Sequence, residues 1–178
     1  MRLVLGVVGF VLFFFYDFNQ IKWNNPFVKK FFFIGIALII VATVSALTFN
    51  IVNYMGTVIA LIGLAFTVYA LFFALDFDAT YVDGKFKVYD QGVYALCRHP
   101  GFYGLFVLYL GLYITYQTQE FLGMFVIFNV LNFLYICFQD KIVFVKVFSD
   151  YAEYKKRVPF LIFNKKSIQE CVKLWRKQ

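Results

Sequence analysis

The sequence predicts an all-α integral membrane protein with about five transmembrane helices, on the grounds of composition, uncharged runs and charge distribution. The 178 residues are 62% hydrophobic and 23% aromatic, which is more apolar surface than one soluble core of this length buries. A helix needs roughly 20 apolar residues to cross the hydrocarbon layer. Five uncharged runs are candidates for such helices, at residues 3–16, 31–49, 51–75, 101–119 and 121–138.

The first of these runs is the shortest and allows a second interpretation. Residues 3–16 have the length of a signal-peptide apolar region, but only Arg2 precedes them and no small-x-small cleavage site follows directly. We therefore favour a retained helix, which either crosses the bilayer fully or lies as a shallow helix in locally thinned lipid.

The basic residues predict the orientation of the helices, because Lys and Arg accumulate in cytoplasmic loops. Every Lys and Arg except Arg2 falls in residues 17–30, in residues 76–100 or after residue 138, which the five runs place on one side. The sequence therefore predicts an outside N-terminus and a cytoplasmic C-terminus, with residues 1–178 forming a single multi-pass membrane domain. A bacterial inner membrane and the endoplasmic reticulum both fit this charge pattern.

The segments between and after the runs carry weaker signals. Asp83-Gly84 is a turn signal and favours a short hairpin within the polar loop at residues 76–91. The apolar run at residues 142–148 indicates that the last membrane helix continues beyond residue 138. A cytoplasmic helical segment follows, with Tyr151, Tyr154 and Val158 on one face and Pro159 as its stop.

Composition also bears on the classes of partner. A basic tail next to a membrane helix is better explained by anionic headgroups than by nucleic acid, so the expected partner is the lipid bilayer. The three cysteines show no CxxC spacing and the chain has one histidine, a pattern that argues against a metal site. Chemistry in this protein is therefore expected to use an organic cofactor or none.

The motif Cys97 to Gly104, CRHPGFYG, contains the residues most suited to binding a ligand. Pro100 fits the first turn of the fourth helix, where its missing N–H has no helical partner. The free N–H groups of that turn form an anion site beside Arg98 and His99. Gly101 and Gly104 would let a ligand approach the backbone. The alternative is that the two charged residues lie at the interface and the glycines allow close helix packing.

A second polar position, Gln139-Asp140, is expected at the same depth, where the fifth helix leaves the membrane. Asp140 can supply a carboxylate to a ligand held near Arg98. The alternative is an ion pair between these two residues that only fastens two helices together.

In these motifs the chain resembles the isoprenylcysteine carboxyl methyltransferase family and its phospholipid and thiol methyltransferase relatives. The resemblance is carried by GVYALCRHPGFYG at residues 92–104, by the acidic position some 35 residues later and by YAEYKKRVP at residues 151–159. It covers about residues 88–163. It implies S-adenosylmethionine bound at the cytoplasmic face between the RHP helix and the C-terminal segment, with a lipidic or small hydrophobic methyl acceptor entering from the bilayer.

The resemblance implies a role for each of these residues. Arg98, His99 and the helix start would hold the cofactor carboxylate, and Asp140 the ammonium, with Gln139 hydrogen-bonding nearby. His99 is also the one candidate for a catalytic base. Aromatic rings would stack on adenine or face the sulfonium. The cofactor-binding set is therefore Arg98, His99, Pro100, Gly101, Tyr103, Gly104, Gln139, Asp140, Tyr151 and Tyr154, with Tyr94 and Phe102 as further aromatic candidates.

Two other functions remain open. Relatives usually carry a Glu-Glu pair where this chain, aligned on Tyr151 without a gap, has Gln139-Asp140, and the loss of one carboxylate favours a catalytically silent membrane protein of the same fold. Sterol reductases that use NADPH share an RHP-type motif, but they commonly carry Asn and Asp where this chain has Gly101 and Leu105. The retained YAEYKKRVP block favours the methyltransferase.

Overall fold

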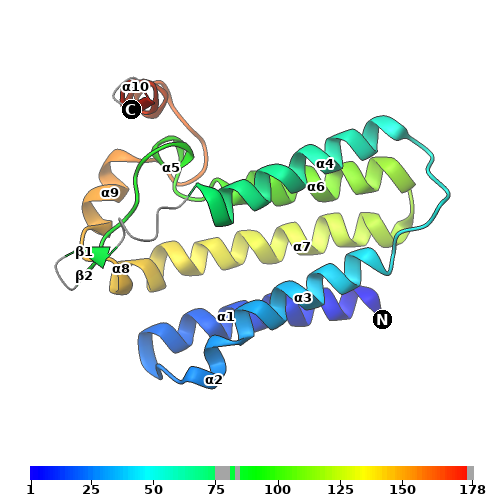
Figure 1. Ribbon diagram of the computed structural model, residues 1–178, viewed down its shortest axis with the longest axis horizontal. Coiled ribbons are helices and arrows are strands. Elements are labelled where there is room, and N and C mark those ends of the chain that lie inside the picture. Colours follow the sequence, from blue (N-terminus) through cyan, green and yellow to red (C-terminus); the bar gives the residue numbers. More distant parts are fainter. Residues whose placement is uncertain (75–80, 83–84, 176–178) are drawn as a thin grey trace.

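The computed structural model describes residues 1–74, 81–82 and 85–175 and shows a bundle of largely apolar helices, as expected of a helical membrane protein. Long helices lie side by side along one axis, and short elements gather at one end of the bundle (Figure 1). We call this the capped end; the N-terminus lies at the opposite end. The long elements are α1 (Arg2–Lys22), α3 (Phe31–Val44), α4 (Tyr54–Val68), α6 (Gly101–Tyr116) and α7 (Gln119–Phe138).

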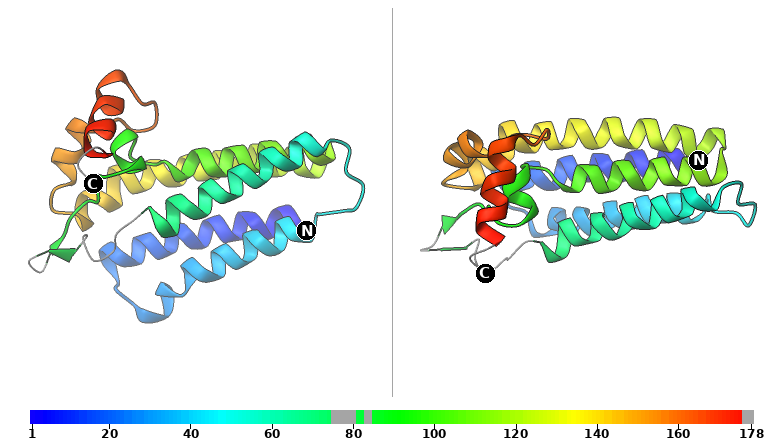
Figure 2. Two further views of the ribbon diagram at one scale, coloured as in Figure 1. Left: turned by 45° about the horizontal axis from the view of Figure 1, so that its top comes forward. Right: turned by 90° about the horizontal axis from the view of Figure 1, so that it is seen from above.

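The capped end consists of short helices, π-helical turns and a two-stranded hairpin. Figure 2 shows α10 running across the end of the bundle rather than along it. These elements are η1 (Tyr69–Phe73), β1 (Tyr81–Val82), β2 (Lys85–Phe86), α5 (Val93–Leu96), η2 (Gln139–Val143), α8 (Phe144–Val147), α9 (Tyr151–Arg157) and α10 (Lys165–Trp175), and α2 (Pro26–Lys29) joins α1 to α3.

Within the described residues, four helices are long and apolar enough to cross a membrane: Arg2–Lys22, Pro26–Val44, Tyr54–Phe73 and Gln119–Val147. The first is therefore longer than the run at residues 3–16, and the last continues past residue 138, as predicted. The remaining predicted span is α6, with 16 residues. At 1.5 Å per residue it is about 24 Å long, less than the roughly 30 Å hydrocarbon core. The five predicted spans thus correspond to four full-length helices and one shorter one.

Polar side chains set the helix ends. The Asn53 side chain accepts hydrogen bonds from the Met55 and Gly56 amides at the start of α4. Thr118 caps α7 in the same way, one residue after Gln117 adopts the left-handed conformation that ends α6. Such caps satisfy amides that have no partner within the helix. The sharp α6–α7 turn makes these two helices antiparallel neighbours.

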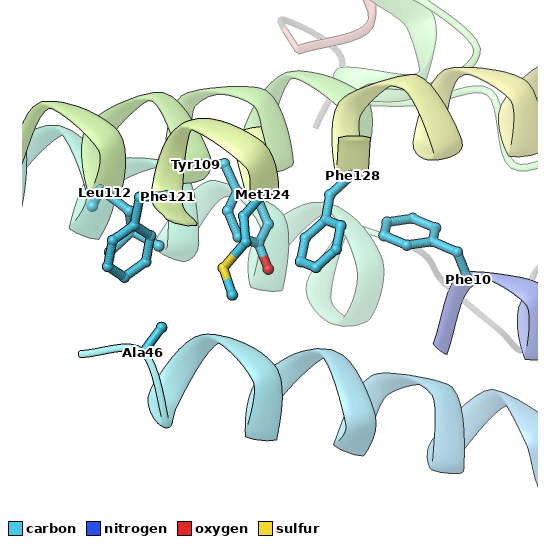
Figure 3. Close-up of a cluster of buried hydrophobic side chains, with 8 residues drawn as sticks. Phe10, Ala46, Tyr109, Leu112, Phe121, Met124 and Phe128 are labelled. Atoms are coloured by element: carbon cyan, nitrogen blue, oxygen red, sulfur yellow. The ribbon is translucent and has the colours of Figure 1, made fainter. Parts of the chain in front are cut away.

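An aromatic cluster holds the helices together at the middle of the bundle (Figure 3). Phe128 of α7 packs against Phe10 of α1, with ring centroids 5.7 Å apart, and edge-on against Tyr109 of α6 at 5.1 Å. The buried Tyr109 hydroxyl lies 2.7 Å from the Thr43 hydroxyl of α3, so its hydrogen-bonding capacity is met inside the bundle. The Phe128 ring is therefore the point at which α1, α6 and α7 contact one another.

The expected hairpin is present as a pair of antiparallel strands, in which Tyr81 lies opposite Phe86 and Val82 opposite Lys85. The turn expected at Asp83-Gly84 lies outside the described residues. The hairpin is fixed to the C-terminal part of the chain, because the Ser149 amide donates to the Phe86 carbonyl and the Val88 amide donates to the Asp150 carboxylate.

Candidate functional site

The RHP motif lies where the chain leaves α5 and enters α6. Cys97 is extended, and the next amide, that of Arg98, donates to the Pro159 carbonyl at 3.0 Å. Pro100 has the helical φ of −63° at the cap of α6, as its ring requires. The motif is thus held between the start of α6 and the C-terminal segment. Burial raises the pKa of Cys97 to about 11, so its thiol stays protonated at neutral pH.

The carboxylate of Asp140 is the centre of a buried polar cluster. Its Oδ1 accepts from Arg98 Nε at 2.7 Å and from the Tyr151 hydroxyl at 2.7 Å. Its Oδ2 accepts from Arg98 Nη2 at 3.3 Å and lies 3.0 Å from Lys155 Nζ. The Asp140 and Arg98 side chains are only 6% and 9% exposed. We refer to Arg98, His99, Asp140, Tyr151 and Lys155 as the Asp140 cluster.

The guanidinium of Arg98 also binds the C-terminal segment. Its Nη1 donates to the Val158 carbonyl at 2.8 Å and to the Lys155 carbonyl at 3.3 Å. Its carbon lies 5.6 Å from the centroid of the Phe160 ring. Carbonyls at the end of a helix lack partners within that helix, and Arg98 supplies donors to two of them at the end of α9. One side chain therefore joins α6, η2 and α9.

His99 is buried beside the Arg98–Asp140 ion pair but does not hydrogen-bond to it. Its Nε2 lies 3.6 Å from Asp140 Oδ1, beyond hydrogen-bond distance, and has no hydrogen-bond partner among the described residues. The ring stacks on Phe144 and meets Phe160 edge-on. Burial lowers the pKa of His99, although the Asp140 carboxylate opposes the shift. The imidazole is therefore neutral at pH 7 and keeps one unpaired nitrogen.

The predicted tyrosines use their hydroxyls to fasten the capped end. Tyr154 donates to the Tyr94 carbonyl and Tyr94 donates to the Ala70 carbonyl in η1, both at 2.7 Å. Tyr103 donates to the Leu161 carbonyl at 3.0 Å. Burial raises the pKa of both Tyr151 and Tyr154 further above its ordinary value, so these hydroxyls remain donors. The predicted helical face of α9, with Tyr151, Tyr154 and Val158 buried, is confirmed.

Two of the predicted ligand contacts point elsewhere. A side-chain carbon at Gly104 would meet Thr67 Oγ1 at 2.5 Å and its backbone nitrogen at 2.7 Å. Gly104 therefore allows α4 and α6 to approach closely and does not open the backbone to a ligand. Gln139 turns away from the cluster and donates to the buried carboxylate of Asp17 at 2.9 Å. Gly101 has only the side chains of Leu71 and Ala70 near the corresponding position.

Sequence reasoning missed Lys155 and Asp17. Lys155 stands four residues after Tyr151, so a helical spacing places both on one face, but the sequence KKR favoured a solvated charge run. Asp17 ends an otherwise apolar run, and an acidic residue within a membrane helix is a signal of function or of a buried partner. The Asp17 carboxylate accepts hydrogen bonds from side chains that include Gln139 and Gln20.

The Asp140 cluster can neutralise and orient a charged group. The atom in the cluster that remains without a hydrogen-bond partner among the described residues is Nε2 of His99. Because Arg98 and Asp140 are paired with each other and with α9, a ligand that binds either group has to displace one of these existing partners. In the part of the chain that the structure describes, no three His, Cys, Asp or Glu side chains lie close enough to hold a metal ion.

A comparison with protein-family models matches residues 16–158 to a family described as "Protein of unknown function (DUF1295)". The match includes the RHP motif, Asp140 and α9. A search of curated proteins gave no significant match. A search of solved structures gave none either.

Proposed function

The chain belongs to the DUF1295 family, whose description names no activity. From the residues of the chain itself, we propose that it is an S-adenosylmethionine-dependent methyltransferase. The acceptor is a lipidic or small hydrophobic molecule. The observation that carries the proposal is the meeting of Arg98, Asp140 and Tyr151. These three residues belong to the segments in which the resemblance lies, and they converge within hydrogen-bond distance at one end of the membrane bundle.

A zwitterionic amino acid group fits the Arg98–Asp140 pair on grounds of charge. Its carboxylate can take the place of Asp140 against the guanidinium, and its ammonium can take the place of Arg98 against the carboxylate. The buried charges then remain balanced, which matters because an unpaired buried charge is costly. The unpaired His99 Nε2 is a further polar atom that a bound molecule could satisfy.

The protein's own part in the reaction is binding and orientation. S-adenosylmethionine would supply an activated methyl group on its sulfonium for in-line transfer to the acceptor, with the neutral thioether S-adenosylhomocysteine as the leaving group. Arg98, Asp140 and Tyr151 would fix the donor, and the surrounding rings of Phe144 and Phe160 keep water away. A carboxylate or thiolate acceptor needs no base. For an amine acceptor, the neutral His99 can accept the proton at Nε2.

We assign the capped end to the cytoplasmic side. Among the described residues, every Lys and Arg except Arg2 lies at this end of the five helices, and such residues accumulate in the cytoplasm. The cofactor would then be bound from the cytosol and the acceptor from the inner leaflet.

Calorimetric titration of the purified protein in nanodiscs with S-adenosylmethionine tests the proposal. Binding is expected, and Asp140→Asn should weaken it about 10- to 100-fold, since hydrogen bonds to charged groups contribute about 1.5–3 kcal/mol. Tyr151→Phe should weaken it less. Lys156→Gln is the matched control, because it removes an exposed charge from α9, the helix that contains Tyr151. A folded parent protein that gives no heat would contradict the proposal.

One observation favours a second function, in which the Asp140 cluster only stabilises the packing of the helices and the protein is not an enzyme. The Asp140 carboxylate already accepts from three side chains, so its charge is compensated within the protein. In that case S-adenosylmethionine does not bind, and Asp140→Asn lowers only the thermal stability. An NADPH titration of the same sample is the third arm, and binding of NADPH alone would assign a reductase instead.

A further inference from the structure

An apolar hollow lies beside α1 near the capped end, and its lining shares no residue with the Asp140 cluster. Its volume is about 380 Å³, and its lining consists of apolar side chains: Val11, Phe14, Phe15, Phe18, Trp23 and Phe138. Small-molecule sites are commonly about 300–1,000 Å³. A hollow of this size without polar lining, between the apolar helices α1 and α7, suits a hydrocarbon chain.

Aromatic contacts give the hollow a defined shape. The rings of Phe14 and Phe138 lie 5.3 Å apart and join α1 to α7. Trp23 meets Phe18 edge-on at 4.9 Å, directly after the end of α1. Tryptophan prefers the membrane–water interface, where its ring contacts chains and its N–H contacts headgroups. Trp23 therefore marks the level at which a lipid chain would enter the hollow.

A positive charge stands at the same level. The ammonium of Lys22 lies 5.7 Å from the centroid of the Phe18 ring, one of the rings that line the hollow. The one acidic residue of α1, Asp17, is buried and accepts hydrogen bonds from Gln139 and Gln20. Within α1, the charge near the hollow is therefore not balanced by a carboxylate.

We propose that the hollow binds one acyl chain of an anionic phospholipid, whose phosphate contacts Lys22. The apolar lining accounts for the chain, the ammonium accounts for the negative headgroup and Trp23 lies between them. This site is independent of the proposed methyltransferase activity, because it uses none of the residues of the Asp140 cluster.

Quenching of tryptophan fluorescence tests the proposal. The chain has two tryptophans, so Trp175→Phe leaves Trp23 as the single reporter. In detergent micelles, phosphatidylglycerol with brominated acyl chains should quench Trp23 saturably and at lower concentration than brominated phosphatidylcholine. Lys22→Gln should raise the half-quenching concentration of phosphatidylglycerol about fivefold, as expected for one basic side chain at an anionic lipid surface. Lys30→Gln, from the same loop region, is the matched control and should change little.

Two further variants separate the site from general contact with lipid. Val11→Phe narrows the hollow and should weaken quenching by both lipids. In the same background, Trp23→Phe with Phe33→Trp moves the reporter to an exposed position on α3, where no preference between headgroups is expected. Equal quenching of Trp23 by the two lipids, or a preference that Lys22→Gln leaves unchanged, would overturn the proposal. Circular dichroism confirms that each variant is folded.

Discussion

The Asp140 carboxylate accepts hydrogen bonds from three side chains that belong to two separate parts of the sequence. Arg98 precedes α6, and Tyr151 and Lys155 belong to α9. Removing one partner of a buried ion pair typically costs about 3–5 kcal/mol, because the other charge is left without compensation. The stability of the capped end thus depends on a few polar residues, whereas the bundle depends on many apolar ones.

At the residue scale, His99 predicts a dependence of stability on pH. Its folded-state pKa is lowered by burial, so below about pH 6.5 the unfolded chain binds a proton that the folded protein does not. The free energy of unfolding should therefore fall as the pH drops from 7.5 to 5.5, by at most about 1.4 kcal/mol per pH unit from this group. Denaturation in mixed micelles at several pH values measures it. His99→Gln should show a smaller decrease, and an equal decrease in both proteins would contradict the assignment.

The sequence predicted which residues belong to the candidate site better than it predicted which partners their side chains contact. Arg98, His99, Asp140 and Tyr151 do lie together, because the motif that begins α6 and the amphipathic face of α9 are both visible as patterns. The direction of Gln139 was not predictable, since its partner Asp17 lies 122 positions away and no periodicity links the two.

At the element scale, small residues let α4 and α6 approach closely. Gly56 and Gly63 of α4 and Gly104 and Gly111 of α6 each stand seven residues apart. A side-chain carbon at Gly111 would lie 2.6 Å from the Ala60 Cα and 2.8 Å from the Gly56 carbonyl oxygen. Membrane helices rely on such contacts, because lipid provides no hydrophobic force between them.

Gly111→Ala should therefore destabilise the protein by about 1–3 kcal/mol, as overpacking does elsewhere. Gly123→Ala is the matched control, because its new carbon would meet only Leu3 Cδ2 at an ordinary 3.8 Å. In α7 this change should be neutral or stabilise by up to about 1 kcal/mol through helix propensity. Thermal unfolding in detergent compares the two variants, and a Gly111→Ala protein as stable as the parent would argue against tight α4–α6 contact.

Apolar runs located every long helix, but not its ends or its irregular turns. The end of α1 extends to Lys22 because polar residues continue a helix that apolar length alone would stop at residue 16. The π-helical turns η1 and η2 leave no mark in a hydropathy pattern, since they alter the hydrogen-bond register and not the composition.

For the whole molecule, the arrangement of α1, α3, α4, α6 and α7 predicts that the two termini lie on opposite sides of the membrane. In a bacterial host, green fluorescent protein fused after Gln178 should fluoresce, because the proposed orientation places that terminus in the cytoplasm. Alkaline phosphatase fused after Asn50 should be active, since this turn is expected outside. An inactive phosphatase at Asn50 together with a dark C-terminal fusion would reverse the orientation.

The order in which the chain is synthesised has a consequence for the Arg98–Asp140 contact. Arg98 emerges from the ribosome 42 residues before Asp140 and 60 residues before Val158, whose carbonyl completes its set of acceptors. Domains form from the N-terminus onward during translation, so two membrane helices are inserted while this guanidinium still depends on water or headgroups. Closure of the capped end is thus a late step of biogenesis. A chain truncated before Tyr151 would present an incompletely satisfied charged pair to proteolytic quality control.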